Sequence, residues 1–187
     1  MNVNKKIHCV LAQRGMGIEN AGHVKLCNLS RDIFKDTKGD PYRLDQTNLK
    51  EIWRNNITRK EVNDSLDKGI RHENCQLCWD SEDSGVKSIR QIMNDKYPKA
   101  LNGLPEQPSI INLKPGNTCN FGCRFCNAED SDQLYQIDYK LKQKNKISYE
   151  KYLQSYDSYK QSFKKDSEFW QVMNDWSHGI EHYALYG

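Results

Sequence analysis

The sequence predicts an α+β N-terminal module that binds metal, followed by the start of an α/β unit. The first observation is that the seven cysteines fall into two groups, four within the first 80 residues and three close together further on. The second is a stretch with glycine and three prolines, 98–108, which is typical of a linker. The third is the short apolar run Ser109–Leu113, which resembles a buried strand and leads into the second cysteine group. We therefore expect one domain over 1–97 and a second over 109–187.

The N-terminal domain is predicted to begin with a β-hairpin over residues 7–28. Ile18–Gly22 supplies its turn residues, and Val24 and Leu26 alternate with polar residues in its second strand. Residues 29–47 are polar and are expected to form a loop. Helices are then predicted from Leu49, over about 58–68 and over about 87–96.

The second unit is predicted as a strand, a connection, a helix and a further strand. The polar residues 128–147 are expected to be a solvated connection, and Tyr149–Phe163 has aromatic residues at helical spacing. A helix is predicted over Ser167–His178, with Gly179 as its stop signal. Ile180–Tyr186 then completes a pair of strands that suits a parallel sheet.

Composition excludes several classes of protein. The 28 Lys and Arg are offset by 25 Asp and Glu, so the net charge of +3 indicates neither a disordered polyelectrolyte nor a nucleic-acid-binding arm. No apolar run is long enough for a membrane helix, and no signal peptide is visible. We therefore expect a cytoplasmic protein with reduced thiols, and neither membrane nor nucleic acid as a partner. Leu, Ile, Val and Phe are only about a fifth of the residues, so bound metal is expected to help stabilise the fold.

The second cysteine group has the spacing Cys-x3-Cys-x2-Cys, formed by Cys119, Cys123 and Cys126. Three thiolates so close together can reach one small metal centre, and a four-iron cluster held by three of them keeps one iron open to another ligand. Gly122 would let the backbone fold tightly around such a centre. A zinc site completed by a histidine, His178 or His182, is the alternative.

This segment resembles the cluster loop of radical S-adenosylmethionine (radical SAM) enzymes. The resemblance rests on the cysteine spacing, on Phe125 before the last cysteine and on the strand ahead of the loop. It implies a partial (βα)6 barrel, a [4Fe–4S] cluster on the three cysteines, and S-adenosylmethionine on the fourth iron with Phe125 beside its adenine. It also implies that Gly187 is the first glycine of the family's Gly-Gly-Glu-Pro stretch. The barrel would then be incomplete in this chain, which we expect to be the N-terminal portion of a longer or split enzyme.

The first cysteine group consists of Cys9, Cys27, Cys75 and Cys78. Its pattern resembles the twitch domain, a shorter relative of the SPASM domain, which implies that all four cysteines ligate one auxiliary [4Fe–4S] cluster. A Cys-x2-Cys pair with two distant cysteines also suits structural zinc, so both interpretations stay open. Trp53 and Trp79 are expected to pack around this site.

The resemblance implies an enzyme that cleaves S-adenosylmethionine to generate a 5′-deoxyadenosyl radical and modifies a peptide, a protein or a small molecule. Its partners would be S-adenosylmethionine, a possible peptide substrate and a reductant such as ferredoxin or flavodoxin. No catalytic residue beyond the cluster is assigned, and this chain alone is expected to be inactive. The alternative function is a non-catalytic scaffold or interaction module that binds zinc or a cluster.

Overall fold

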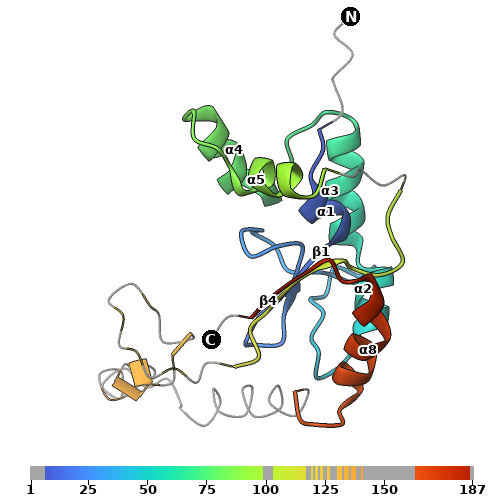
Figure 1. Ribbon diagram of the computed structural model, residues 1–187, viewed down its shortest axis with the longest axis vertical. Coiled ribbons are helices and arrows are strands. Elements are labelled where there is room, and N and C mark those ends of the chain that lie inside the picture. The colour runs from blue at the N-terminus through green and yellow to red at the C-terminus, as the bar shows by residue number, and fades with distance from the viewer. Residues whose placement is uncertain are drawn as a thin grey trace, which may run out of the picture.

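The computed structural model describes the chain over a set of ranges, namely 7–98, 103–116, 119, 121, 123, 126, 130–131, 133–134, 136–137, 140 and 163–185. These residues form a small α/β fold around one four-stranded mixed sheet (Figure 1). The strands are β1 (Gly15–Ile18), β2 (Val24–Lys25), β3 (Ile110–Leu113) and β4 (His182–Leu185). Their order in the sheet is β2-β1-β3-β4.

Both predicted domains contribute strands to this sheet. β1 pairs antiparallel with β2 and parallel with β3, and β3 pairs parallel with β4. Met16 lies opposite Ile111, which in turn lies opposite Tyr183. The division at 98–108 stays a prediction, but the described strands on its two sides share one sheet and one buried core.

The hairpin is smaller than the sequence predicted. Residues 7–28 do not form it as a whole, because helix α1 (Val10–Arg14) comes before β1 and all five of its residues are buried. The hairpin turn contains Gly22 at a φ of 76°, a conformation that glycine adopts without strain. Five residues give too little periodicity for a helix to be recognised from sequence.

Four helices lie close to their predicted positions, whereas the helix over Gln76–Asp83 was not predicted, and three of the four begin at a polar side-chain cap. Asn48, Asn56 and Ser88 accept hydrogen bonds from backbone N–H groups at the starts of their helices, and Ser88 forms a full capping box. The described helices after α1 are α2 (Leu49–Asn55), α3 (Ile57–Asp67), α4 (Gln76–Asp83), α5 (Ile89–Lys96) and α8 (Glu168–Trp176), with short 3-10 turns η1 (Glu73–Cys75) and η3 (Ser177–Gly179).

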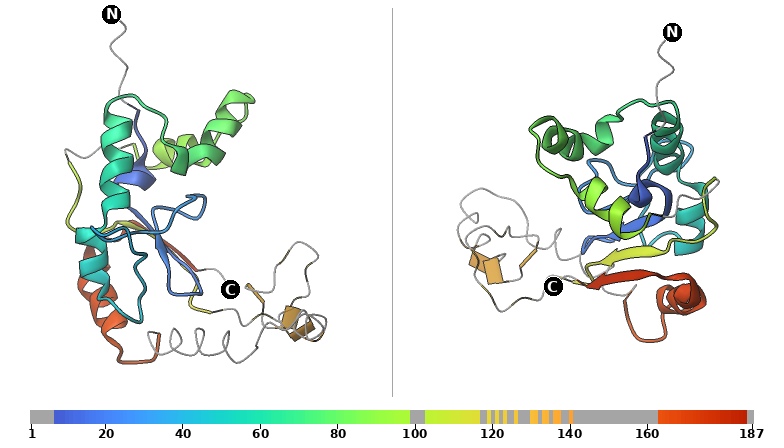
Figure 2. Two further views of the ribbon diagram at one scale, coloured as in Figure 1. Left: turned by 180° about the vertical axis from the view of Figure 1, so that it is seen from behind. Right: turned by 45° about the horizontal axis from the view of Figure 1, so that its top comes forward.

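The sheet has helices on both sides. Figure 1 shows it nearly edge-on, with α1, α4 and α5 on one side and α2 and α8 on the other, and Figure 2 gives two further views. Because side chains alternate along a strand, the register puts one set of residues on a single face, which we call the glycine face. Its members are Gly15, Gly17, Ile110, Asn112, His182 and Ala184.

The predicted linker is attached to the core through Pro105. The carbonyl oxygen of Pro105 accepts hydrogen bonds from Trp53 Nε1 at 3.1 Å and from Arg59 at 3.1 Å. The Arg59 guanidinium also lies 3.6 Å from the centre of the Trp53 ring, and burial lowers its pKa to about 10. Within the described residues, no helix combines the length and apolar character needed to cross a membrane.

Candidate metal centre

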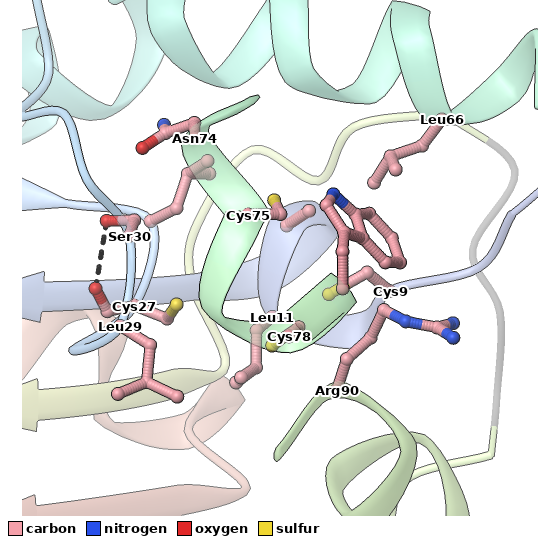
Figure 3. A pocket seen from close by; sticks show the side chains of 13 residues that line it. Cys9, Leu11, Cys27, Leu29, Ser30, Leu66, Asn74, Cys75, Cys78 and Arg90 are labelled. Carbon is pink, nitrogen blue, oxygen red and sulfur yellow. Dashed lines mark hydrogen bonds between the residues drawn. The ribbon is translucent and has the colours of Figure 1, made fainter. Parts of the chain in front are cut away.

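Four cysteines that are far apart in sequence line one cavity, which we call the four-cysteine cavity (Figure 3). They are Cys9, Cys27, Cys75 and Cys78, the set predicted for the first metal site. The volume of this cavity is about 20 Å³. Its surface has almost no nitrogen or oxygen, and no carboxylate or imidazole lines it. An all-sulfur donor set in apolar surroundings suits a thiolate-bound metal centre.

Three separate segments bring these cysteines together. Cys9 is the residue before α1, and Cys27 follows β2. Cys75 is the residue before α4, and Cys78 lies one turn later on the same helix. Residues three apart in a helix share a face, so the Cys-x2-Cys pair presents both thiols to the cavity. Negative charge on Cys75 is also favoured because it lies at the positive end of the α4 dipole.

Gly15 lets two cysteine-bearing segments approach the sheet closely. A Cβ atom at Gly15 would lie 2.5 Å from the carbonyl oxygen of Leu11 and 2.8 Å from that of Leu26. Leu11 belongs to the helix that follows Cys9, and Leu26 immediately precedes Cys27. A side chain at position 15 would therefore push apart the segments that carry two of the four thiols.

Gly17 also lets a neighbouring chain segment approach the sheet, although the contacts are less close than at Gly15. A Cβ atom there would lie 3.3 Å from Asn28 Oδ1 and 3.4 Å from the carbonyl carbon of Cys27. The segment that follows β2 therefore rests directly on the glycine face. The sequence analysis missed both glycines as site residues, since their role depends on chain segments that lie elsewhere in the sequence.

Helix α5 fixes the backbone on either side of Cys9. Asn94 Oδ1 accepts a hydrogen bond from the Val10 amide at 2.8 Å, and Asn94 Nδ2 donates to the His8 carbonyl at 2.8 Å. Arg90 donates to the same carbonyl at 2.7 Å. These three bonds hold the backbone immediately before and after Cys9, so the thiol is positioned by a helix more than 80 residues away in sequence.

Arg90 also brings a positive charge to the cavity wall. Its guanidinium makes a bidentate ion pair with Glu82, at 2.9 and 2.7 Å, and Ser88 Oγ donates to the same carboxylate at 2.6 Å. Arg90 lowers the pKa values of the Cys75 and Cys78 thiols, although burial outweighs this effect. A fixed cation beside thiolates is one way in which a protein tunes a metal–sulfur centre.

Burial raises the pKa of all four thiols. The pKa of Cys27 rises to about 11 and that of Cys75 to about 12, in both cases chiefly through desolvation. The pKa values of Cys9 and Cys78 are raised for the same primary reason. The thiols also raise one another's pKa, since each thiolate disfavours the next. A metal cation is the partner that would let such a group of thiols ionise together at neutral pH.

One buried polar atom among the residues that line the cavity has no partner. Asn74 lines the four-cysteine cavity and is fully buried. Its Oδ1 accepts a hydrogen bond from the Asp32 amide at 2.6 Å, which fixes the orientation of the carboxamide, whereas Nδ2 makes no hydrogen bond. In Figure 3 the carboxamide points away from the four sulfur atoms, so Asn74 fixes the chain beside Cys75 and is not directed at a bound centre. The donor set of the cavity, four thiols without a carboxylate or imidazole, is the feature that fits a thiolate-bound centre.

The two predicted packing tryptophans lie in different places. Trp79 lines the four-cysteine cavity, and its Nε1 donates to the His72 carbonyl at 2.9 Å. The guanidinium groups of Arg71 and Arg90 lie 5.4 and 5.2 Å from its ring centre. Trp53 does not line this cavity and instead packs with Arg59 in the core, so the prediction for Trp53 is wrong. The Trp53 side chain lies on α2 and is buried in the hydrophobic core.

The three-cysteine loop follows β3, as the sequence predicted. Cys123 is exposed, whereas Cys119 and Cys126 are half-buried, and the Cys126 amide donates to the Cys123 carbonyl at 3.1 Å. Phe125 and Gly187, the two residues predicted to bind S-adenosylmethionine, lie outside the described residues, as does Gly122.

An ion pair closes the base of the segment that carries this loop. Lys114, the residue after β3, pairs with Asp130 at 2.7 Å, and Asn20 Nδ2 donates to the same carboxylate at 3.4 Å. Lys114 also donates its amide to the Ile18 carbonyl at the end of β1. The loop therefore starts and ends at the carboxyl edge of the parallel strands, where α/β folds usually carry their ligand sites.

Among the described residues, no three His, Cys, Asp or Glu side chains are close enough to hold a single metal ion. The same holds for the loop cysteines together with His178 and His182, the alternatives for a fourth ligand of a zinc site. The four N-terminal cysteines share a cavity without converging on one point.

Comparison of the chain with protein-family models, curated proteins and solved structures finds no match. The resemblance to radical SAM enzymes therefore rests on the sequence motifs alone, and the geometry of the four-cysteine cavity stands independently of it.

Proposed function

We propose that this chain belongs to a radical SAM enzyme and binds its clusters. In this proposal Cys9, Cys27, Cys75 and Cys78 hold an auxiliary [4Fe–4S] cluster, and Cys119, Cys123 and Cys126 hold the cluster that binds S-adenosylmethionine. The observation that carries the proposal is the one cavity that four cysteines from three distant segments line. The position of the three-cysteine loop after a parallel strand supports its second part.

The residues of the chain have separate tasks in this proposal. Gly15 and helix α5 hold Cys9 and Cys27 in place, and Arg90 offsets the negative charge of the thiolates. Cys119, Cys123 and Cys126 would hold the second cluster, which with S-adenosylmethionine and one electron from an external reductant would supply radical chemistry at a substrate C–H bond. The apolar wall around the four thiols lowers the polarity of their surroundings.

A zinc scaffold is the second candidate, because four cysteines are also the donor set of a structural zinc site. The two candidates differ in how far apart the sulfur atoms must stand. Four thiolates about 2.3 Å from one tetrahedral zinc lie close to each other, whereas a cluster of four irons and four sulfides holds them further apart. Iron, sulfide and zinc analysis therefore distinguishes the two candidates.

Anaerobic purification with metal and sulfide analysis tests the proposal. We expect a brown protein with about eight irons per chain, four for each cluster. Cys123→Ala should remove the iron of the three-cysteine loop and retain about four irons per chain, whereas Cys75→Ala should remove the iron of the other centre. A colourless protein that carries zinc and no iron would contradict the proposal, as would loss of all iron in Cys123→Ala.

A further inference from the structure

A second cavity of about 280 Å³ lies against the four-cysteine cavity and shares Leu11, Cys27 and Leu29 with it. We call it the sheet cavity, because Asn112 and His182 on the glycine face also line it. Its volume is near the lower end of the range for small-ligand sites. An occupant would therefore touch the sheet on one side and the Cys27 segment on the other.

The lining of the sheet cavity is aliphatic with a few polar groups. Ile89 and Met93 of helix α5 add to the leucines, and the polar side chains are those of Asn28, Asn112 and His182. No Lys, Arg, Asp or Glu lines the cavity, so a charged group that entered it would lose its hydration without gaining an ionic partner. This lining selects for an uncharged occupant.

The polar groups are available for a ligand. Within the described part of the chain, the polar side-chain atoms of Asn28, Asn112 and His182 make no hydrogen bond or ion pair with the protein, although His182 has a ring contact with Tyr97. A carboxamide offers two donors and an acceptor, which complement the C=O and N–H of another amide. A few convergent polar groups in an aliphatic cavity are the usual features of a binding site.

We propose that the sheet cavity binds an uncharged, amide-bearing ligand with a small aliphatic part, and that this ligand is a peptide segment. A peptide bond matches the two asparagine carboxamides, and an aliphatic side chain matches Ile89 and Met93. The binding of a peptide to this cavity is independent of the proposed function. Its role as the substrate of the enzyme rests on the proposed function. Because Cys27 belongs to both cavities, the occupant would lie directly beside the auxiliary centre.

Titration of the anaerobically purified chain with N-acetyl-L-leucine N-methylamide tests this inference. We expect saturable shifts of the side-chain amide signals of Asn28 and Asn112 in nuclear magnetic resonance spectra. Two comparison ligands identify the features that matter. L-leucinamide keeps the side chain but carries a positive charge, and N-methylacetamide keeps one amide but lacks the side chain. Both should bind at least about tenfold more weakly, which corresponds to about 1.4 kcal/mol.

Met93→Trp should fill the cavity and abolish binding of this probe. The matched control is Ile92→Trp on the same helix, because Ile92 is 44% exposed and does not line the cavity. Asn112→Leu, which keeps the size of the side chain, should weaken binding about tenfold through loss of a hydrogen-bonding partner. This second variant keeps the test decisive should Met93→Trp fail to fold.

Three results would overturn the inference, namely no saturable binding, equal binding of all three ligands, and equal binding by the wild-type chain and Asn112→Leu. These outcomes are distinguishable from failure of the proposed function. A chain that carries zinc and still binds the probe refutes the radical-enzyme proposal and leaves the peptide site standing. A chain that carries two clusters and does not bind the probe refutes the peptide site and leaves the radical-enzyme proposal standing.

Discussion

The four-cysteine cavity draws its thiols from three separate segments, whereas the three-cysteine loop carries its thiols within eight consecutive residues. The arrangement of the first set of thiols therefore depends on the fold, and in particular on β1, α1, α4 and α5. The second depends on a short loop whose two ends are fixed near Lys114 and Asp130. A change that disturbs the fold should affect the first centre, and a change in the loop should affect the second alone.

The largest predicted effect is that of pH on the unfolding free energy of the metal-free chain. Folding raises the pKa values of Cys27 and Cys75 from 9.0 to about 11 and 12, so the folded state binds more protons than the unfolded state above about pH 8.5. The stability from these groups is fully present below that pH and is lost as the pH rises towards 12. We expect a loss on the order of several kcal/mol in urea unfolding between pH 8 and pH 11.

The variant Cys27→Ala is the control for this pH dependence and should reduce it, with the remainder due to the other buried thiols. Metal loading should correspondingly release protons, because the buried thiols must ionise to bind. A metal-free chain with the same unfolding free energy at pH 8 and pH 11 would contradict the burial of the four thiols.

The next largest effect is expected at Gly15. Gly15→Ala puts a Cβ atom 2.5 Å from a backbone oxygen, so the chain segments beside Cys9 and Cys27 must shift. We expect a loss of about 2–3 kcal/mol in unfolding free energy, together with loss of iron from the four-cysteine cavity. The loop iron should stay. Gly17→Ala, with a closest contact of 3.3 Å, should have a smaller effect, and equal stability of Gly15→Ala and the wild-type chain would refute the account.

A smaller effect is expected at Asn74. Asn74→Leu removes the buried donor and leaves the Asp32 amide without its acceptor, which should cost about 1–2 kcal/mol. Urea unfolding of the metal-free chain measures this loss. An unfolding free energy equal to that of the wild-type chain would contradict the buried hydrogen bond between Asn74 and the Asp32 amide.

The smallest effect is expected at the base of the loop. The side chains of Lys114 and Asp130 are about one third exposed, so Lys114→Ala should cost less than about 1 kcal/mol. The difference from the wild-type chain should shrink at high salt, and iron in the four-cysteine cavity should be unaffected. A large loss of that iron in Lys114→Ala would show that the two centres are not independent.

Local patterns predicted much of the fold. The caps at Asn56 and Ser88 are encoded within a few residues, and the helices over 57–67 and 89–96 were found within about two residues of their ends. The strand Ile110–Leu113 was predicted from its apolar run and its flanking prolines. The Cys-x2-Cys pair and the two distant cysteines, grouped through a resemblance and not through geometry, line one cavity, while their role as metal ligands stays a prediction.

Features that depend on distant contacts were missed. The parallel pairing of β1 with β3 joins residues almost 100 apart in sequence, and no local pattern encodes it. The roles of Gly15 and Asn74 likewise arise from backbone segments that meet only in the folded chain. The sheet cavity combines side chains from five segments, so no motif could have indicated it.

The most direct test of the central claim is metal analysis of a chain in which Cys119, Cys123 and Cys126 are all replaced by alanine. This variant keeps the four-cysteine cavity and removes every thiol of the loop. Purified without oxygen, it should contain about four irons and four sulfides per chain, the composition of one [4Fe–4S] cluster. One zinc per chain, or no metal at all, would contradict the assignment of an iron–sulfur centre to Cys9, Cys27, Cys75 and Cys78.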